Sequence, residues 1–166
     1  MSRIKVIIIA TSLLLLCTMI VLFISGLRMY NMHSNASMFP TLKKGDYFLV
    51  KLHPDIRGLQ RGDIILVRNH TDLTELAVLT KRIIGLPNET IRISNDSVFI
   101  MHAFLPESYA YFETHNSPYS RLEQQQIARD HFFVMGDNRD NSIDSRDQRL
   151  GTIDKMNILG KVIRIF

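Results

Sequence analysis

Hydrophobic residues along the chain fall into two patterns, one long uninterrupted run followed by many short patches. The run extends over the 22 positions from Val6 to Leu27, contains no charged residue, and is bounded by Lys5 and Arg28. At about 1.5 Å per residue, a helix of this length crosses a hydrocarbon layer of roughly 30 Å. The run therefore predicts a transmembrane helix near the N-terminus.

We expect this helix to be retained as an anchor. A cleavable signal peptide has a shorter apolar stretch, roughly 7 to 15 residues, with a small-x-small cleavage site close behind it. The nearest such triplet, Ser34-Asn35-Ala36, lies well downstream of the run. Basic residues flank the helix on both sides: Arg3 and Lys5 precede it, and Arg28, Lys43 and Lys44 follow it. The charge pattern therefore leaves the orientation open.

After residue 27, short patches rich in Val, Ile, Phe and Tyr alternate with turn signals such as Arg61-Gly62-Asp63. This pattern favours strands and a mostly β domain over residues 28–166. The predicted strands are Asp46–Leu52, Asp63–Arg68, Ala77–Leu86, Thr90–Ile93, Ser97–Met101, His131–Met135 and Leu159–Phe166. One soluble helix is expected near Ser120–Arg129, and residues 102–130 are interpreted as an insertion.

Composition narrows the function classes. With 46% hydrophobic residues in 166, the chain can bury the core of one domain. The single cysteine, Cys17, lies inside the apolar run, so we expect neither an intramolecular disulfide framework nor a CxxC site. The net charge of +4 includes Arg3 and Lys5, and no dense basic cluster is interleaved with aromatic residues. Nucleic-acid binding is therefore not expected.

Three segments carry candidate chemistry: SNASMFPTL at 34–42, TKRIIGLPNE at 80–89 and MGDNRDNSIDSR at 135–146. In this order behind an apolar helix, they resemble the bacterial type I signal peptidases, and the resemblance covers most of the chain. It implies a single N-terminal transmembrane helix followed by a signal-peptidase-like β domain.

A serine nucleophile needs a base. No GxSxG or HExxH motif accompanies the six histidines, so a Ser-His-Asp triad or a zinc site has little support. Lys81 is flanked by apolar residues of a predicted strand, and burial there would lower its pKa from about 10.4. The resemblance implies that Ser37 is the acylating nucleophile and Lys81 its general base, with no metal or organic cofactor. Strand alternation puts Arg82 on the opposite face, solvated or paired.

The third segment is too polar for an ordinary strand, and Gly136 followed by Asp137 and Asn138 indicates a sharp turn. The resemblance implies that Ser142 hydrogen-bonds the lysine amine and positions it. It also implies that Asp144 and Arg146 form a pair that holds the loop, with Gly136 as structural support.

Asn35 departs from the family pattern, in which this position is usually Ser or Gly. Where the family has Ser, that side chain helps to bind the oxyanion. The NH2 group of Asn35 could donate instead, or Asn35 could occupy a turn while backbone amides, especially that of Ser37, bind the oxyanion. Both alternatives stay open.

The resemblance further implies a substrate class and a location. The substrates would be signal peptides of translocated preproteins, with small side chains at the first and third positions before the cleaved bond. An extended substrate is expected to pair with the edge from Val78 to Thr80, and Met38 to help shape shallow pockets.

The location implied is the bacterial cytoplasmic (inner) membrane, close to the secretion translocon. Residues 1–27 would form a cytoplasmic stub and a single-pass anchor in the lipid bilayer, and residues 28–166 an extracytoplasmic catalytic domain. Two alternatives remain at this point: a dedicated peptidase for conjugation or pilin precursors with the same dyad, and a non-catalytic membrane-tethered paralogue.

Overall fold

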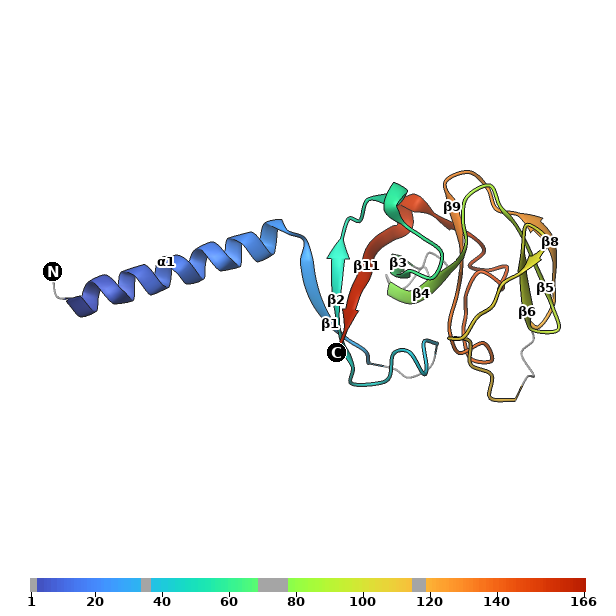
Figure 1. The fold of residues 1–166 in the computed structure, drawn as a ribbon, viewed down its shortest axis with the longest axis horizontal. Coiled ribbons are helices and arrows are strands. Elements are labelled where there is room, and N and C mark those ends of the chain that lie inside the picture. Colours follow the sequence, from blue (N-terminus) through green and yellow to red (C-terminus); the bar gives the residue numbers. More distant parts are fainter. Residues whose placement is uncertain (1–2, 34–36, 69–77, 115–118) are drawn as a thin grey trace.

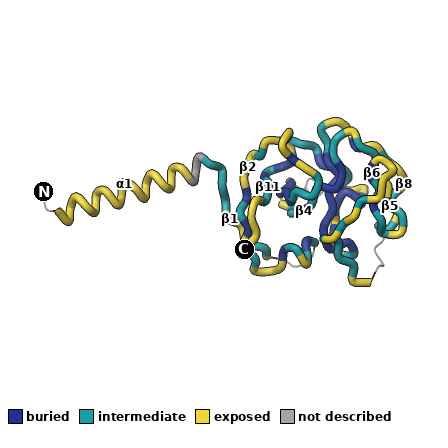
Figure 2. The backbone as a smooth tube through the Cα atoms, in the orientation of Figure 1, coloured by how far each residue is buried: buried dark blue, intermediate teal, exposed yellow. Residues whose placement is uncertain are grey.

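A single long helix projects away from a β-rich body in the computed structural model, which describes residues 3–33, 37–68, 78–114 and 119–166 (Figure 1). The helix, α1, spans Arg3–Ile24, and every residue from Arg3 to Val21 is exposed (Figure 2). Within the described residues, Arg3–Val21 is the one stretch long and apolar enough to cross a membrane.

The helix ends three residues before the predicted end of the apolar run. Gly26 adopts a φ of 68° in the turn after Ile24, a conformation that favours glycine and commonly terminates helices. Leu27, which the sequence predicted to lie in the helix, instead starts the first strand and pairs with Lys51.

The described strands form two antiparallel sheets. The first has the order β1-β2-β11-β3-β4-β9-β10, and the second has the order β7-β6-β5-β8. The first sheet contains β1 (Leu27–Asn31), β2 (Tyr47–Leu52), β3 (Ile64–Arg68), β4 (Val78–Gly85), β9 (His131–Met135), β10 (Ile153–Asp154) and β11 (Ile158–Ile165). The second contains β5 (Thr90–Ser94), β6 (Ser97–Ile100), β7 (Ala103–Phe104) and β8 (Leu122–Gln126). Two short 3-10 helices, Ile56–Gly58 and Lys155–Asn157, lie in connections.

The second sheet packs on the first through an apolar core, seen as buried backbone between the sheets in Figure 2. The first sheet contributes Ile84, Phe133 and Met135, and the second Ile91, Ile93, Val98 and Ile100. Strand alternation explains the pattern, because every second residue of β5 and β6 is buried while its neighbours are more exposed. The core therefore fixes β4 and β9, which both lead into the candidate site.

The seven predicted strands are present within two residues of their predicted bounds. The helix predicted near Ser120–Arg129 is wrong, because that segment forms β8. Gln and Glu favour helices on their own, but here Gln125 and Gln126 pair with Ile91 and Thr90 of β5. Ile127, which follows, is fully buried in the core between the sheets. Pairing and burial therefore override the local preference.

Candidate active site

The segment that carries Ser37 is held in place by its apolar residues. Met38 and Leu42 are fully buried, and the backbone N–H of Leu42 donates to the Met38 carbonyl at 2.8 Å. They pack in a cluster with Phe48, Val50, Ile64 and Leu66 of β2 and β3. Ser37 itself is half-buried. The motif therefore places the serine at the edge of a hydrophobic cluster that packs on the first sheet.

Lys81 lies in the middle of β4, opposite Ile65 of β3, and only 2% of it is exposed. Burial lowers the pKa of Lys81 to about 8, because the charged amine loses its hydration. The charges around it act in both directions: Asp144 and Asp137 raise this pKa, whereas Arg146 lowers it. Burial has the largest effect, as the apolar neighbours in the sequence predicted.

Gly136 is the point where the serine segment and the polar loop meet. Its N–H donates to Asp144 Oδ2 at 2.9 Å. A Cβ on this glycine would lie 2.4 Å from the Ser37 carbonyl oxygen and 2.3 Å from Ser142 Oγ, so both groups occupy the space a side chain would need. Asp144, which accepts from this N–H, is also the charged group that acts most strongly on Lys81. Ser37, Lys81 and Ser142 therefore converge around this glycine.

Asp144 and Arg146 form a buried ion pair. Arg146 Nε donates to Asp144 Oδ1 at 2.8 Å and Nη2 donates to Oδ2 at 2.9 Å. Burial acts to raise the pKa of Asp144, but hydrogen bonding and the charge of Arg146 outweigh it and keep that pKa below its usual range. The Ser142 hydroxyl acts in the same direction as Arg146, although it makes no hydrogen bond of standard geometry with the described residues. The ion pair therefore keeps Asp144 ionised although it is buried, and it holds the loop in one conformation.

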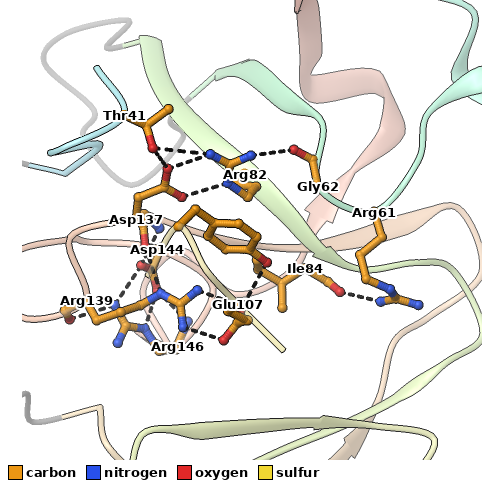
Figure 3. Close-up of polar contacts among 12 residues, drawn as sticks. Thr41, Arg61, Gly62, Arg82, Ile84, Glu107, Asp137, Arg139, Asp144 and Arg146 are labelled. Carbon is orange, nitrogen blue, oxygen red and sulfur yellow. Dashed lines mark hydrogen bonds and ion pairs between the residues drawn. The ribbon is translucent and has the colours of Figure 1, made fainter. Parts of the chain in front are cut away.

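A second buried carboxylate, Asp137, joins the strand of the lysine to the segment of the serine (Figure 3). Arg82, the neighbour of Lys81, donates to Asp137 Oδ1 at 2.8 Å and to Oδ2 at 2.6 Å. Thr41 donates to Asp137 Oδ2 at 2.5 Å. The Asp137 carboxylate thus links the segment that carries Ser37 to the strand that carries Lys81.

A groove of about 530 Å³ lies beside these groups, between the end of β1 and the start of β4. Its lining includes Val78 and Thr80 of β4, His33, and the apolar side chains of Phe48 and Leu66. On the side of β4 away from β3, pairing with β9 begins only at Arg82. Among the described residues, no strand pairs with that edge from Val78 to Thr80.

The structure brings together most of the residues predicted for the site. Ser37, Lys81, Gly136, Ser142, Asp144 and Arg146 meet in one region, and Val78 and Thr80 line the groove. Met38 does not line it, because it is 1% exposed and packs in the core beneath the groove. Asn35 lies outside the described residues.

The sequence interpretation missed three residues of the polar network: Thr41, Glu107 and Tyr109. The last two belong to the segment interpreted as an insertion, yet Glu107 pairs with Arg139 at 2.7 Å and the Arg82 guanidinium lies 4.1 Å from the Tyr109 ring centre. These contacts join positions 27 or more residues apart, and no local pattern could have indicated them.

Comparison with known proteins defines the class. A family model described as signal peptidase, peptidase S26, matches residues 3–166. The chain therefore belongs to the S26 family of peptidases.

Several curated proteins named signal peptidase I are similar to the chain. Signal peptidase I P of Bacillus subtilis subsp. natto is 38% identical over 48% of the chain and 46% of its own length. Signal peptidase I of Leptolyngbya laminosa is 33% identical over 76% of the chain and 63% of its own length. The chain thus spans less than two thirds of the length of these curated relatives. The crystal structure of a signal peptidase I from Enterococcus faecalis matches with a TM-score of 0.52 and 28% identity, covering 64% of the chain and 98% of that structure.

Proposed function

We propose that this protein is a membrane-anchored serine endopeptidase that removes signal peptides from preproteins, with Ser37 as nucleophile and Lys81 as general base. The observation that carries the proposal is the burial of Lys81 next to the Ser37 segment. A lysine with a pKa of about 8 is neutral in about a tenth of molecules at pH 7. An exposed lysine would be neutral in fewer than about one in a thousand.

The chemistry follows from this proton balance. The neutral amine of Lys81 accepts the proton of the Ser37 hydroxyl while Oγ bonds to the substrate carbonyl carbon. The resulting ammonium gives its proton to the amine that leaves when the C–N bond breaks, and an ester to Ser37 remains. Lys81 then takes a proton from the water whose oxygen attacks the ester, and it returns this proton to Ser37 Oγ as the bond between Oγ and the carbonyl carbon breaks and the acid is released. Lys81 therefore acts first as a base and then as an acid, both in the acylation of Ser37 and in the hydrolysis of the ester.

Ser142 is proposed to hold the amine of Lys81. Its hydroxyl is buried, is not satisfied by standard hydrogen bonds within the described chain, and meets Gly136 at the same point as the Ser37 carbonyl. No hydrogen bond of standard geometry joins this hydroxyl to Lys81 in the structure. The proposal therefore rests on the position of Ser142 beside Gly136 and on the cost of leaving a buried hydroxyl without a well-formed hydrogen bond. Asp144 and Arg146 are proposed to keep this loop in position, and their ion pair supports that role.

The substrate is proposed to bind as an added strand in the groove. Val78 and Thr80 lie on an edge of β4 that β9 leaves unpaired, and both line the groove of about 530 Å³. Small side chains at the first and third positions before the cleaved bond are proposed from the family. The groove is lined by the polar side chains of His33 and Thr80. Phe48 and Leu66 add apolar surface to the lining.

The setting proposed is the bacterial cytoplasmic (inner) membrane. The exposed apolar helix α1 supports a membrane anchor. The proposal adds that the N-terminus lies in the cytoplasm and residues 28–166 lie outside it, near the secretion translocon. Signal sequences emerge on that side, so the proposed activity requires this orientation. The lipid bilayer would then hold the site near the apolar helix of each substrate.

The test uses the full chain in detergent with a preprotein substrate, followed by electrophoresis and mass spectrometry of the products. We expect cleavage after the signal peptide by the wild type and none by Ser37→Ala, Lys81→Ala or Lys81→Arg, since a guanidinium does not deprotonate. The double variant Ser37→Ala/Lys81→Ala should be no worse than either single variant, because the two residues act as a unit. Matched controls are Ser97→Ala and Lys155→Ala, which lie outside the site and should cleave normally.

Each result bears on the proposal. Activity in Ser37→Ala or Lys81→Ala would overturn the dyad, and an inactive wild type would favour a non-catalytic paralogue. Cleavage restricted to pilin or conjugation precursors in a panel of preproteins would identify a dedicated peptidase.

A further inference from the structure

Two residues from the connection between β7 and β8 reach the interior of the site. Tyr109 and Glu107 precede β8 of the second sheet, whereas Ser37, Lys81 and the polar loop belong to the first. The Arg82 guanidinium lies 4.1 Å from the centre of the Tyr109 ring, within the range of a cation–π contact. The connection between these two strands of the second sheet thus touches the arginine that follows Lys81.

The hydroxyl end of the same tyrosine is fixed as well. It donates to Glu107 Oε1 at 3.0 Å, and burial, followed by the charge of Glu107, raises the pKa of Tyr109, so the hydroxyl stays protonated. Glu107 in turn accepts from Arg139 Nη2 at 2.7 Å and Nη1 at 2.8 Å (Figure 3). Tyr109 is therefore held by a carboxylate that is itself held by a buried arginine.

These contacts form a closed circuit of interactions around the polar loop. Arg139 Nε donates to the Gly136 carbonyl at 3.0 Å, and the next residue, Asp137, receives Arg82. Following the contacts from Arg82 through Tyr109, Glu107 and Arg139 thus leads back to Asp137 and Arg82. We propose that Tyr109 is a positioning residue: its ring holds Arg82 on Asp137 and so maintains the electrostatic setting of Lys81. This inference rests on the proposed function.

The expected consequence concerns the proton on Lys81. The charged groups that act on this amine are Asp144, Asp137 and Arg146, and Arg82 offsets Asp137 from the adjacent position of β4. Without the aromatic face, water reaches the Arg82–Asp137 pair and the guanidinium holds the carboxylate less firmly. The uncompensated charge of Asp137 then favours the protonated amine. Loss of the ring should therefore move the titration of Lys81 to higher pH.

The test compares Tyr109→Leu with Tyr109→Phe in the full chain. Tyr109→Leu should lower kcat about tenfold with KM within twofold, and should shift the acid limb of the rate upward. Tyr109→Phe keeps the aromatic ring, so its kcat should stay within about threefold of the wild-type value. The acid limb of its pH–rate profile should not shift. Tyr47→Leu, a matched change at an exposed tyrosine, should match the wild type. If Tyr109→Leu does not fold, Tyr109→Met fills a similar volume without an aromatic face and takes its place.

A second measurement does not depend on turnover. NMR of lysine labelled with 13C at Cε, with the Lys81 signal assigned from Lys81→Met, follows the titration of Lys81 directly. An upward shift of its midpoint in Tyr109→Leu supports the inference even if no preprotein is cleaved, in which case the proposed function alone fails. An unshifted midpoint overturns the inference, as does an equal loss of kcat in the Leu and Phe variants.

Discussion

The backbone N–H of Asn138 donates a hydrogen bond of 3.1 Å to the carbonyl oxygen of Ser37. The proposed nucleophile is therefore attached by its own backbone to the loop that carries Ser142 and Asp144. The side chains of Thr41 and Asp137 add a second link between the same two segments. Small movements of the polar loop should for this reason appear directly as changes in turnover.

The first prediction concerns the pH dependence of turnover. Because burial lowers the pKa of Lys81 to about 8, kcat/KM should fall about tenfold per pH unit below that value and level off above it. The measurement is a rate profile from pH 6 to 10 on one preprotein. A limb near 10.5, the ordinary lysine value, would contradict a buried base.

The second prediction concerns stability. The pKa of Lys81 is lower in the folded state, about 8, than the 10.5 of a free lysine, so the unfolded chain binds more protons between these values. The free energy of unfolding should therefore rise with pH from 8 to 10.5, and below pH 8 the full cost of burying the charge, about 3 kcal/mol, is present. Lys81→Met removes that cost.

We expect Lys81→Met to be more stable than the wild type by about 3 kcal/mol at pH 7, and the advantage to shrink toward pH 10.5. Urea unfolding of both chains in the same detergent, at the two pH values, checks this. Lys155→Met, at a half-exposed lysine, is the control and should show no such pH-dependent gain. An equal advantage at both pH values would mean that packing alone is responsible.

The third prediction concerns Gly136→Ala. The added methyl group would lie 2.4 Å from the Ser37 carbonyl oxygen, so the serine segment or the loop must move. A shift of about 1 Å in a catalytic group can cost about 100-fold in rate, and overpacking costs about 1 to 3 kcal/mol in stability. We expect a loss of kcat of that order with the β fold preserved in circular dichroism.

Gly58→Ala is the matched control, because a Cβ there meets Asp55 Oδ2 only at 3.9 Å. It should retain the wild-type rate. Normal turnover in Gly136→Ala would show that the contact with Ser37 is not needed for positioning.

The fourth prediction concerns Asn35, for which the two alternatives remain. If its amide donates to the oxyanion, Asn35→Ala should lower kcat by about 100-fold with little change in KM, because the hydrogen bond strengthens as charge develops. Asn35→Ser should recover part of the rate, and Asn35→Asp should be worse than Asn35→Ala, since a carboxylate has no proton to donate. A near-normal kcat in Asn35→Ala would leave the backbone amides as the donors.

The sequence predicted the strands and the buried lysine well because both depend on local patterns. Strand β9 has its predicted bounds, His131–Met135, and the burial of Lys81 could be inferred from the apolar residues beside it. Strand β1 was missed because it follows the apolar run after a two-residue turn, and β7 and β10 are only two residues long. A pattern of alternation cannot be recognised over two positions.

The polar network was less predictable, because it depends on pairing over long distances in the chain. Nothing near Glu107 in the sequence indicates that Arg139 is its partner, and Asp137 gives no sign of binding Thr41, 96 residues away. These contacts arise only when the second sheet packs against β4 and β9. The sequence motifs contain the residues that meet in the candidate site, including the Asp144–Arg146 pair, but they gave no indication of the contacts of Thr41, Glu107 and Tyr109.

The place of β11 in the first sheet has a consequence for the order of events during synthesis. A ribosome makes β2 and β3 long before β11, yet in the sheet these two strands are joined only through β11. The nascent chain therefore carries Ser37 and Lys81 for some time without the strand that completes their common support. We expect the newly made protein to be inactive until β11 has emerged and docked, so that the proposed peptidase activity begins only once β2 and β3 share one sheet.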